Sequence, residues 1–202
     1  MIKHVPNILT FARLVMTIVL LAMILYFPHV ENIGTYINIA FIFFVVTALT
    51  DIVDGKIARM YNVTSKLGRI MDPLADKILV CGSFICFAII GQPTLFDISG
   101  TWLKVIHWSV VIILIARELY VTILRHIAEA RGINFAATAS GKLKMFLQSF
   151  AIGTVLMKMG HLPTALWAYW FTTIVFAAMV IATVYSGIRA TTRDSWQQLK
   201  DQ

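Results

Sequence analysis

Four aspartates are the most chemically suggestive group in this 202-residue sequence. Asp51, Asp54, Asp72 and Asp76 make up four of its ten acidic residues, and they lie between two strongly apolar segments. An aspartate at the centre of a membrane helix costs about 2.5–3.5 kcal/mol, so we expect these side chains to face protein, water or a bound cation. Carboxylates held close together need a counter-charge. Because hard divalent cations prefer oxygen ligands, the group predicts a site for such a metal.

Small residues accompany the aspartates at helical spacing. On one helix, the first two aspartates share a stripe of roughly 100° with Gly55 and Ala58. On the next helix, the other two share about 80° with Gly68. A short connection can turn the two stripes toward each other and leave room for a ligand near the backbone. Two metals that share carboxylates assist in-line displacement at phosphorus, and Arg59 is suited to pair with a phosphate.

Two other interpretations of the acidic group remain open. The aspartates could be charges at helix ends that the lipid headgroup region solvates. They could also belong to a proton or cation pathway, but such pathways usually spread their acids along the membrane depth. Here the acids gather at one end of two segments, and their interleaving with small residues favours a ligand site.

The composition places this chemistry in a membrane protein. The chain is 59% hydrophobic and 13% charged, with a mean hydropathy of +0.81. Soluble domains are about 45–50% apolar and about 25% charged, so a single-domain soluble enzyme is excluded, as is a disordered chain. The net charge of +7 is better explained by membrane topology than by nucleic acid, and we expect no nucleic-acid partner.

Six apolar segments could cross the membrane. They run over residues 8–27, 36–58, 70–91, 102–125, 140–158 and 164–188. At about 20 residues for each crossing, this predicts an all-α protein with six transmembrane helices in one domain, 1–202. Lysine and arginine gather at the N-terminus, in the second and fourth connections and in the C-terminal tail. The positive-inside rule then places both termini and the acidic stretch on the cytoplasmic side.

The acidic stretch also matches a known signature. From Asp51 to Asp76 it reads D-x2-D-G-x2-A-R-x8-G-x3-D-x3-D, and all eight fixed positions and every spacing agree with the signature of the CDP-alcohol phosphotransferases. The chain therefore resembles this family. The resemblance implies a six-helix integral membrane enzyme, commonly a homodimer, with a site that opens to the cytoplasmic leaflet of the bacterial inner membrane. Such enzymes use Mg²⁺ or Mn²⁺ to displace CMP from a CDP-linked substrate with an alcohol.

The resemblance also implies roles for individual residues. Asp51, Asp54 and Asp72 would be metal ligands, and Asp76 would contribute to a second metal and act as the catalytic base on the acceptor hydroxyl. Residues expected to bind the CDP group are Asn7, Thr10, Asp54, Gly55, Ala58, Arg59 and Gly68. For Asn7 and Thr10, a purely structural role as a helix cap and interfacial anchor is the alternative.

Further segments resemble the family members that take glycerol 3-phosphate as acceptor. These segments are 5–13, 72–77, 116–118 and 141–144, whereas Met145 departs from the threonine that is common there. Since glycerol 3-phosphate is a dianion, its site needs cations. Arg117 and Arg125 are eight residues apart, or about 80° around a helix, so both can face one cavity.

Two lysines complete the expected acceptor phosphate site. Lys142 and Lys144 stand where the next helix begins, and a helix N-terminus also favours an anion. Glu118 could orient Arg117 or a lysine by ion pairing. The alternative is that these cations are topological anchors whose side chains extend to the lipid headgroups.

The expected reaction transfers the phosphatidyl group from CDP-diacylglycerol to glycerol 3-phosphate, among membrane phospholipids, and gives phosphatidylglycerol phosphate and CMP. A related transferase with another acceptor (phosphatidylglycerol, inositol phosphate or serine) is the first alternative. A cation channel or transporter without enzymatic activity is the second.

Overall fold

The computed structural model describes residues 5–60, 66–96, 98–132 and 139–192, and in 5–10, 51–60 and 66–73 it describes the helical backbone alone. These residues form six α-helices and no strand. The helices are α1 (Val5–Tyr26), α2 (Ile33–Met60), α3 (Lys66–Ile90), α4 (Gly100–Ala130), α5 (Ala139–His161) and α6 (Leu166–Thr191), with a short 3-10 turn, η2 (Phe27–His29), after α1. The expected all-α fold and its six helices are confirmed.

Local chemistry sets several of the helix ends. Asn32 caps α2, because its Oδ1 accepts a hydrogen bond of 3.3 Å from the Thr35 N–H. Gly91 follows the end of α3 with a φ of +71°, and Gly132 follows α4 with the same φ. This left-handed conformation suits glycine, because glycine carries no Cβ to clash with the following carbonyl.

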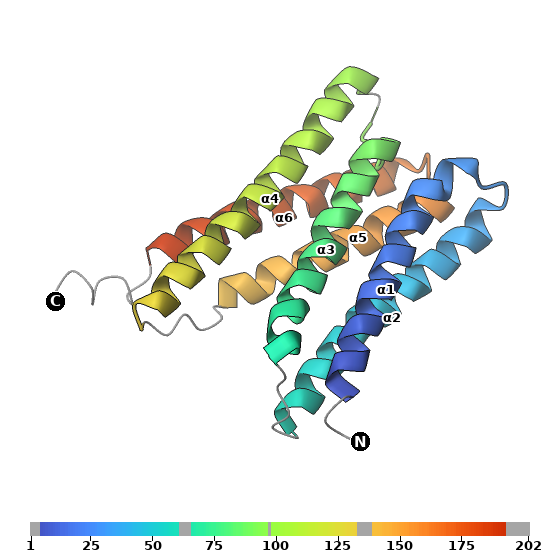
Figure 1. Ribbon diagram of the computed structural model, residues 1–202. Coiled ribbons are helices and arrows are strands. Elements are labelled where there is room, and N and C mark those ends of the chain that lie inside the picture. The colour runs from blue at the N-terminus through green and yellow to red at the C-terminus, as the bar shows by residue number, and fades with distance from the viewer. Residues whose placement is uncertain (1–4, 61–65, 97, 133–138, 193–202) are drawn as a thin grey trace.

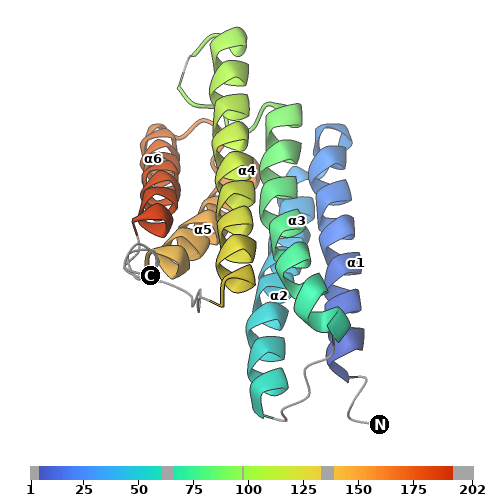
Figure 2. The ribbon, with the colours of Figure 1, turned by 60° about the vertical axis from the view of Figure 1, so that its left-hand side comes forward.

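The six helices form a closed ring of neighbours. Going round the ring, each helix packs on the next in the order α1, α2, α5, α6, α4 and α3, and α3 returns to α1. Figure 1 shows the bundle from one side, and Figure 2 shows α5 running obliquely to α3 and α4. α3 also touches α5 across the ring, so α5 contacts both helices that carry the aspartates.

Apolar side chains fill the centre of the ring. The most enclosed include Leu20, Ile37, Phe87, Leu114, Ile152 and Met179, with at least one from each helix. Phe84 of α3 packs edge-on against Phe176 of α6, with ring centroids 5.8 Å apart. Gly160 lets α5 approach α2 closely, since a Cβ there would lie 2.8 Å from the Ile37 Cβ.

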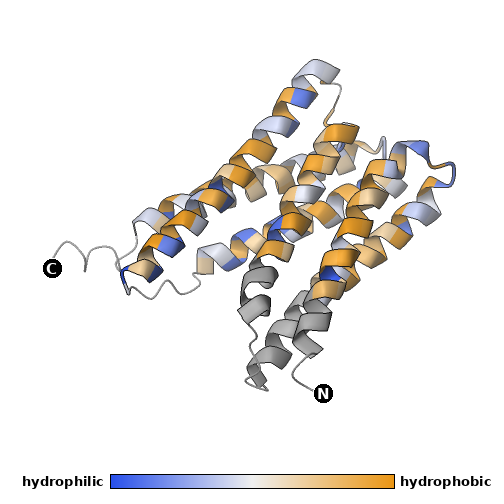
Figure 3. Cartoon of the chain, in the orientation of Figure 1, coloured by the Kyte–Doolittle hydropathy of each residue, from blue (hydrophilic) through white to orange (hydrophobic). Residues whose placement is uncertain are grey.

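The outward faces are also apolar, as the colours of Figure 3 show along most of each described helix. Ile42, Ile174 and Ile181 are each more than 60% exposed. Such surface is unfavourable in water and favourable against lipid. Within the part of the chain that the structure describes, three helical segments are long and apolar enough to cross a membrane: Phe11–His29, Ile33–Thr50 and Leu166–Thr191. The other helices carry ionisable residues along their length, such as Lys144 and Lys158 on α5.

Candidate functional site

The acidic motif spans the connection between α2 and α3. Asp51, Asp54, Gly55, Ala58 and Arg59 belong to the last turns of α2, whereas Gly68, Asp72 and Asp76 belong to the first turns of α3. The two helical stripes expected from the spacing therefore lie on two consecutive helices. Of these residues, only Asp76 has a described side chain. The predicted contacts of the others lie outside the described residues.

Asp76 is half-buried on α3 and points toward the other helices. Its charge acts on the ammonium group of Lys144, which comes from α5. The next residue, Lys77, donates a hydrogen bond of 2.6 Å from Nζ to Thr122 Oγ1 on α4. Thr122 in turn donates to the backbone carbonyl of Glu118, also at 2.6 Å. The middle of α3 is thus fastened to the second half of α4, next to the expected catalytic base.

A charged group at the centre of the bundle joins three further helices. The Glu118 cluster, as we call it, consists of Arg117, Glu118, Lys144 and Ser186. Arg117 Nη1 donates to Glu118 Oε1 at 3.0 Å, and Lys144 Nζ forms an ion pair with the same oxygen. Arg117 Nε also donates to Ser186 Oγ on α6 at 3.1 Å. Because charges removed from water are costly unless paired, the cluster fixes α4, α5 and α6 relative to one another.

The four predicted acceptor residues divide into two pairs. Arg117 and Lys144 meet on one carboxylate, as the suggested orienting role of Glu118 requires. Arg125 and Lys142 are exposed, so they lie nearer the surface than the cluster does. Arg117 and Lys144 thus bring two cations to one carboxylate, and a phosphate could replace part of that pairing.

Several polar groups of this region were not singled out by the sequence analysis. Ser186 and Thr122 are hydroxyls on helices, and their partners come from other helices, so sequence spacing alone gives no signal for them. Gln148 lies one turn beyond Lys144 on α5, is fully buried, and has no hydrogen-bond partner for either amide atom among the described residues. Its signal is a polar residue four positions from a lysine on the same helix face. Arg13 of α1, which ends the family-like segment 5–13, is also buried.

The structure describes the side chain of only one of the four predicted metal ligands, Asp76. Among the described side chains, no three metal-ligating residues gather, and three of the four predicted ligands lie outside that set. The chemistry of the donor set does fit the group, since four carboxylates supply the oxygen ligands that hard divalent cations prefer. The side chains of Asn7 and Thr10 on α1 also lie outside the described residues.

The fold and the acidic motif describe a helical membrane protein with a polar site where two of its helices connect. The chain belongs to the CDP-alcohol phosphatidyltransferase family, whose model matches residues 3–185. This confirms the resemblance and the enzyme class. Members of the family generally use divalent metal ions.

Curated relatives cover most of the chain. A Bacillus subtilis protein named CDP-diacylglycerol–glycerol-3-phosphate 3-phosphatidyltransferase is 35% identical over 79% of this chain and 74% of its own length. A Mycobacterium tuberculosis protein named "Probable phosphatidylglycerophosphate synthase" is 32% identical over 93% of this chain and 79% of its own. A Rickettsia typhi protein with the same name as the Bacillus relative is 29% identical over 77% of each chain.

The Glu118 cluster makes a testable contribution to stability. Changing Glu118→Ala should lower the free energy of unfolding by about 3–5 kcal/mol, because Lys144 would stay buried without its ion-pair partner. Glu129→Ala, at an exposed position of α4, is the matched control and should change stability by less than about 0.5 kcal/mol. The measurement is denaturant unfolding in one detergent. Equal free energies of unfolding for the two variants would contradict a structural role for the cluster.

Proposed function

We propose that this enzyme transfers the phosphatidyl group of CDP-diacylglycerol to glycerol 3-phosphate and so makes phosphatidylglycerol phosphate and CMP. The observation that carries the proposal is the complete eight-residue motif at the connection of α2 and α3, in a chain that belongs to the CDP-alcohol phosphatidyltransferase family. The names of the Bacillus and Rickettsia relatives support the donor and the acceptor.

The motif residues would bind the metal and the donor. Asp51, Asp54, Asp72 and Asp76 would hold two Mg²⁺ or Mn²⁺ ions, which neutralise charge on the diphosphate when bound. The CDP group would lie against Asn7 and Thr10 of α1 and against Asp54, Gly55, Ala58, Arg59 and Gly68. Two of these residues are glycines and one is alanine, so the CDP group can approach the helix backbone.

Asp76 would act as the general base. Its carboxylate would take the proton from the C1 hydroxyl of glycerol 3-phosphate, and the oxygen would attack the β-phosphorus of the donor in line. The bond between that phosphorus and the CMP oxygen would break, and CMP would leave. Asp76 is half-buried, and its charge acts on Lys144, a residue proposed to bind the acceptor phosphate. This placement near the acceptor supports its role as the base. Holding both substrates in this geometry removes much of the entropic barrier.

Arg117 and Lys144 would bind the acceptor phosphate, with the exposed Arg125 and Lys142 at the entrance. The shared carboxylate of Glu118 would preorganise the two inner cations, so that little side-chain freedom is lost on binding. A guanidinium offers paired N–H donors that match phosphate oxygens.

We further propose that the chain is a single domain, 1–202, whose six helices all cross the bacterial inner membrane. Both termini and the site would face the cytoplasm, because lysines and arginines gather at the termini and in the even-numbered connections. The closed ring supports six crossings, since it encloses Arg117 and Glu118 of α4 and Lys144 and Lys158 of α5 among apolar helices. A homodimer, as the family resemblance implies, is the proposed assembly.

The choice of acceptor can be tested by CMP release. Purified protein in detergent with Mg²⁺ should release CMP from CDP-diacylglycerol when glycerol 3-phosphate is added. It should release at least tenfold less with phosphatidylglycerol, inositol phosphate or serine. Preference for one of these compounds would identify a related transferase instead. No acceptor-dependent CMP release under any of these conditions would support a channel or transporter.

Asp76→Asn should lower kcat by about 10²–10⁴-fold, because an amide cannot accept the hydroxyl proton. The measurement is the same CMP assay at two Mg²⁺ concentrations, and raising Mg²⁺ should not restore turnover. Recovery at high Mg²⁺ would assign Asp76 to the metal alone. Near-normal turnover at both concentrations would remove it from the reaction.

Arg117→Ala should raise the KM for glycerol 3-phosphate tenfold or more and leave the KM for CDP-diacylglycerol within about threefold. The expected size follows from a lost hydrogen bond to a charged group, worth about 1.5–3 kcal/mol. Ser186→Ala is the matched control, because it removes the α6 partner of the guanidinium and keeps the guanidinium itself. Equal effects of Arg117→Ala on the two KM values would contradict a phosphate-binding role.

A further inference from the structure

One hydroxyl on α4 connects the helix of the expected base to the helix of an acceptor cation. Thr122 Oγ1 accepts a hydrogen bond of 2.6 Å from Lys77 Nζ on α3, and it donates one of 2.6 Å to the Glu118 carbonyl on its own helix. A hydroxyl has one hydrogen and two lone pairs, so the donation to Glu118 leaves the oxygen to accept from the lysine. An apolar side chain of the same shape can take neither role.

This bond lies where the charged groups of the site converge. Lys77 directly follows Asp76 in the middle of α3. One turn further along α3, the thiol of Cys81 is acted on by the charges of Glu118, Lys144, Asp76 and Lys77. Charged groups from three helices thus lie around one stretch of α3, and the bond to Thr122 is part of this region.

The base and the acceptor cations belong to different helices. Asp76 lies on α3, whereas Arg117 lies on α4 and Lys144 on α5. A general base must lie about 2.6–3.2 Å from the group whose proton it takes. The distance from the carboxylate to the acceptor hydroxyl therefore depends on how α3 is turned against α4. Apolar packing is non-directional, whereas a hydrogen bond from an ammonium group sets an orientation.

The acceptor cations have partners of their own. Arg117 donates to Glu118 and Ser186, and Lys144 forms an ion pair with Glu118. These contacts do not use the hydroxyl of Thr122. Loss of that hydroxyl would consequently move the base relative to the acceptor and leave the phosphate contacts in place.

We propose that Lys77 and Thr122 are positioning residues, which hold α3 in the rotation that brings Asp76 to the acceptor hydroxyl. Neither side chain touches a substrate in this role, because both act through Asp76. The inference rests on the proposed function, since it takes Asp76 as the base and Arg117 and Lys144 as ligands of the acceptor phosphate. It makes the rate of the chemical step depend on one contact between two helices.

Thr122→Val tests the hydroxyl, because it keeps nearly the same shape and removes the bond. In the CMP assay, kcat should fall about 10–100-fold, since a displacement of about 1 Å can cost 10²-fold. The KM values for glycerol 3-phosphate and CDP-diacylglycerol should stay within about twofold. Thr122→Ser retains the hydroxyl and should keep kcat within about threefold of the native value.

Lys77→Met breaks the same bond from the other side. Its kcat should fall about as far as that of Thr122→Val. The double variant should lose no more than the worse single variant, because both changes remove one interaction.

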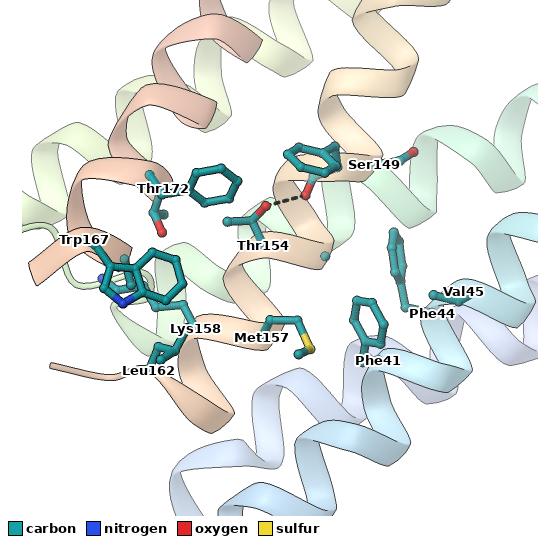
Figure 4. Close-up of a pocket in the computed structure, with 14 residues that line it drawn as sticks. Phe41, Phe44, Val45, Ser149, Thr154, Met157, Lys158, Leu162, Trp167 and Thr172 are labelled. Atoms are coloured by element: carbon teal, nitrogen blue, oxygen red, sulfur yellow. Dashed lines mark hydrogen bonds between the residues drawn. The ribbon is translucent and has the colours of Figure 1, made fainter. Parts of the chain in front are cut away.

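Thr154→Val is the matched control. Thr154 of α5 donates a bond of 2.9 Å to the Phe150 carbonyl, four residues earlier on its own helix, as Thr122 does on α4. It lines an apolar pocket between α2, α5 and α6 (Figure 4), and among the described residues its hydroxyl has no partner on another helix. This variant should keep kcat within about twofold.

Four outcomes would overturn the proposal. Unchanged kcat in Thr122→Val would remove the hydroxyl from positioning, and a similar loss in Thr122→Ser would assign the effect to disturbed packing. A tenfold rise of either KM in Lys77→Met would assign the lysine to substrate binding. Losses that multiply in the double variant would show that the two side chains act separately.

The native protein separates this inference from the proposed function. If it releases CMP with another acceptor, the proposed acceptor is wrong, and the same variants are compared with the acceptor that it uses. No CMP release from the native protein with any acceptor would overturn the proposed function and this inference together.

Discussion

A carboxylate enclosed in an apolar bundle must find a counter-charge, and Glu118 meets two cations. Its pairing with Arg117 and Lys144 joins α4 to α5, and the bond from Arg117 to Ser186 adds α6. The Lys77–Thr122 hydrogen bond then fastens α3 to the same stretch of α4. Four helices thus meet through one polar group. Because apolar packing is non-directional, these directional bonds determine how the helices are turned about their axes.

α5 is the helix that connects the acidic motif with the rest of the ring. α5 lies between α2 and α6 in the ring and also reaches α3, so it touches both helices that carry the acidic motif. Its first turns bring Lys144 to Glu118 and Asp76, and its last turns bring Lys158 to Thr94 and Tyr169. One helix therefore carries a buried lysine near each of its ends. Packing of large apolar residues such as Ile152 and Leu156 fills the space between these lysines.

Much of this organisation could be predicted from the sequence. Long apolar segments specify helices, and the fixed spacing of the aspartates places them at one helical connection. The meeting of Glu118 with Arg117 and a lysine followed from charge alone. The contacts of Thr122 and Ser186 could not be predicted, because they depend on how helices distant in sequence are rotated.

The depth of individual charged residues in the bundle could not be predicted from the sequence either. The 80° separation of Arg117 and Arg125 suggested a shared cavity, but angle carries no information about depth, and Arg125 is exposed where Arg117 is not. Lys158 stands at the last position of the expected segment 140–158, yet it lies within α5 and is buried. Of the six apolar segments expected from the sequence, three meet the length and hydropathy of a membrane crossing within the described residues, and the others carry more ionisable residues.

The polar residues of α5 bear on how the protein is assembled. Lys144, Gln148 and Lys158 all lie on this one helix and are buried in the bundle, so a lone α5 would expose two charges and an amide that only its neighbours enclose. α4 precedes α5 in the chain, so the Glu118 carboxylate is synthesised before Lys144. If both helices cross the membrane, as proposed above, the lysine would then enter next to its counter-charge, and insertion of α5 would be coupled to its pairing with α4.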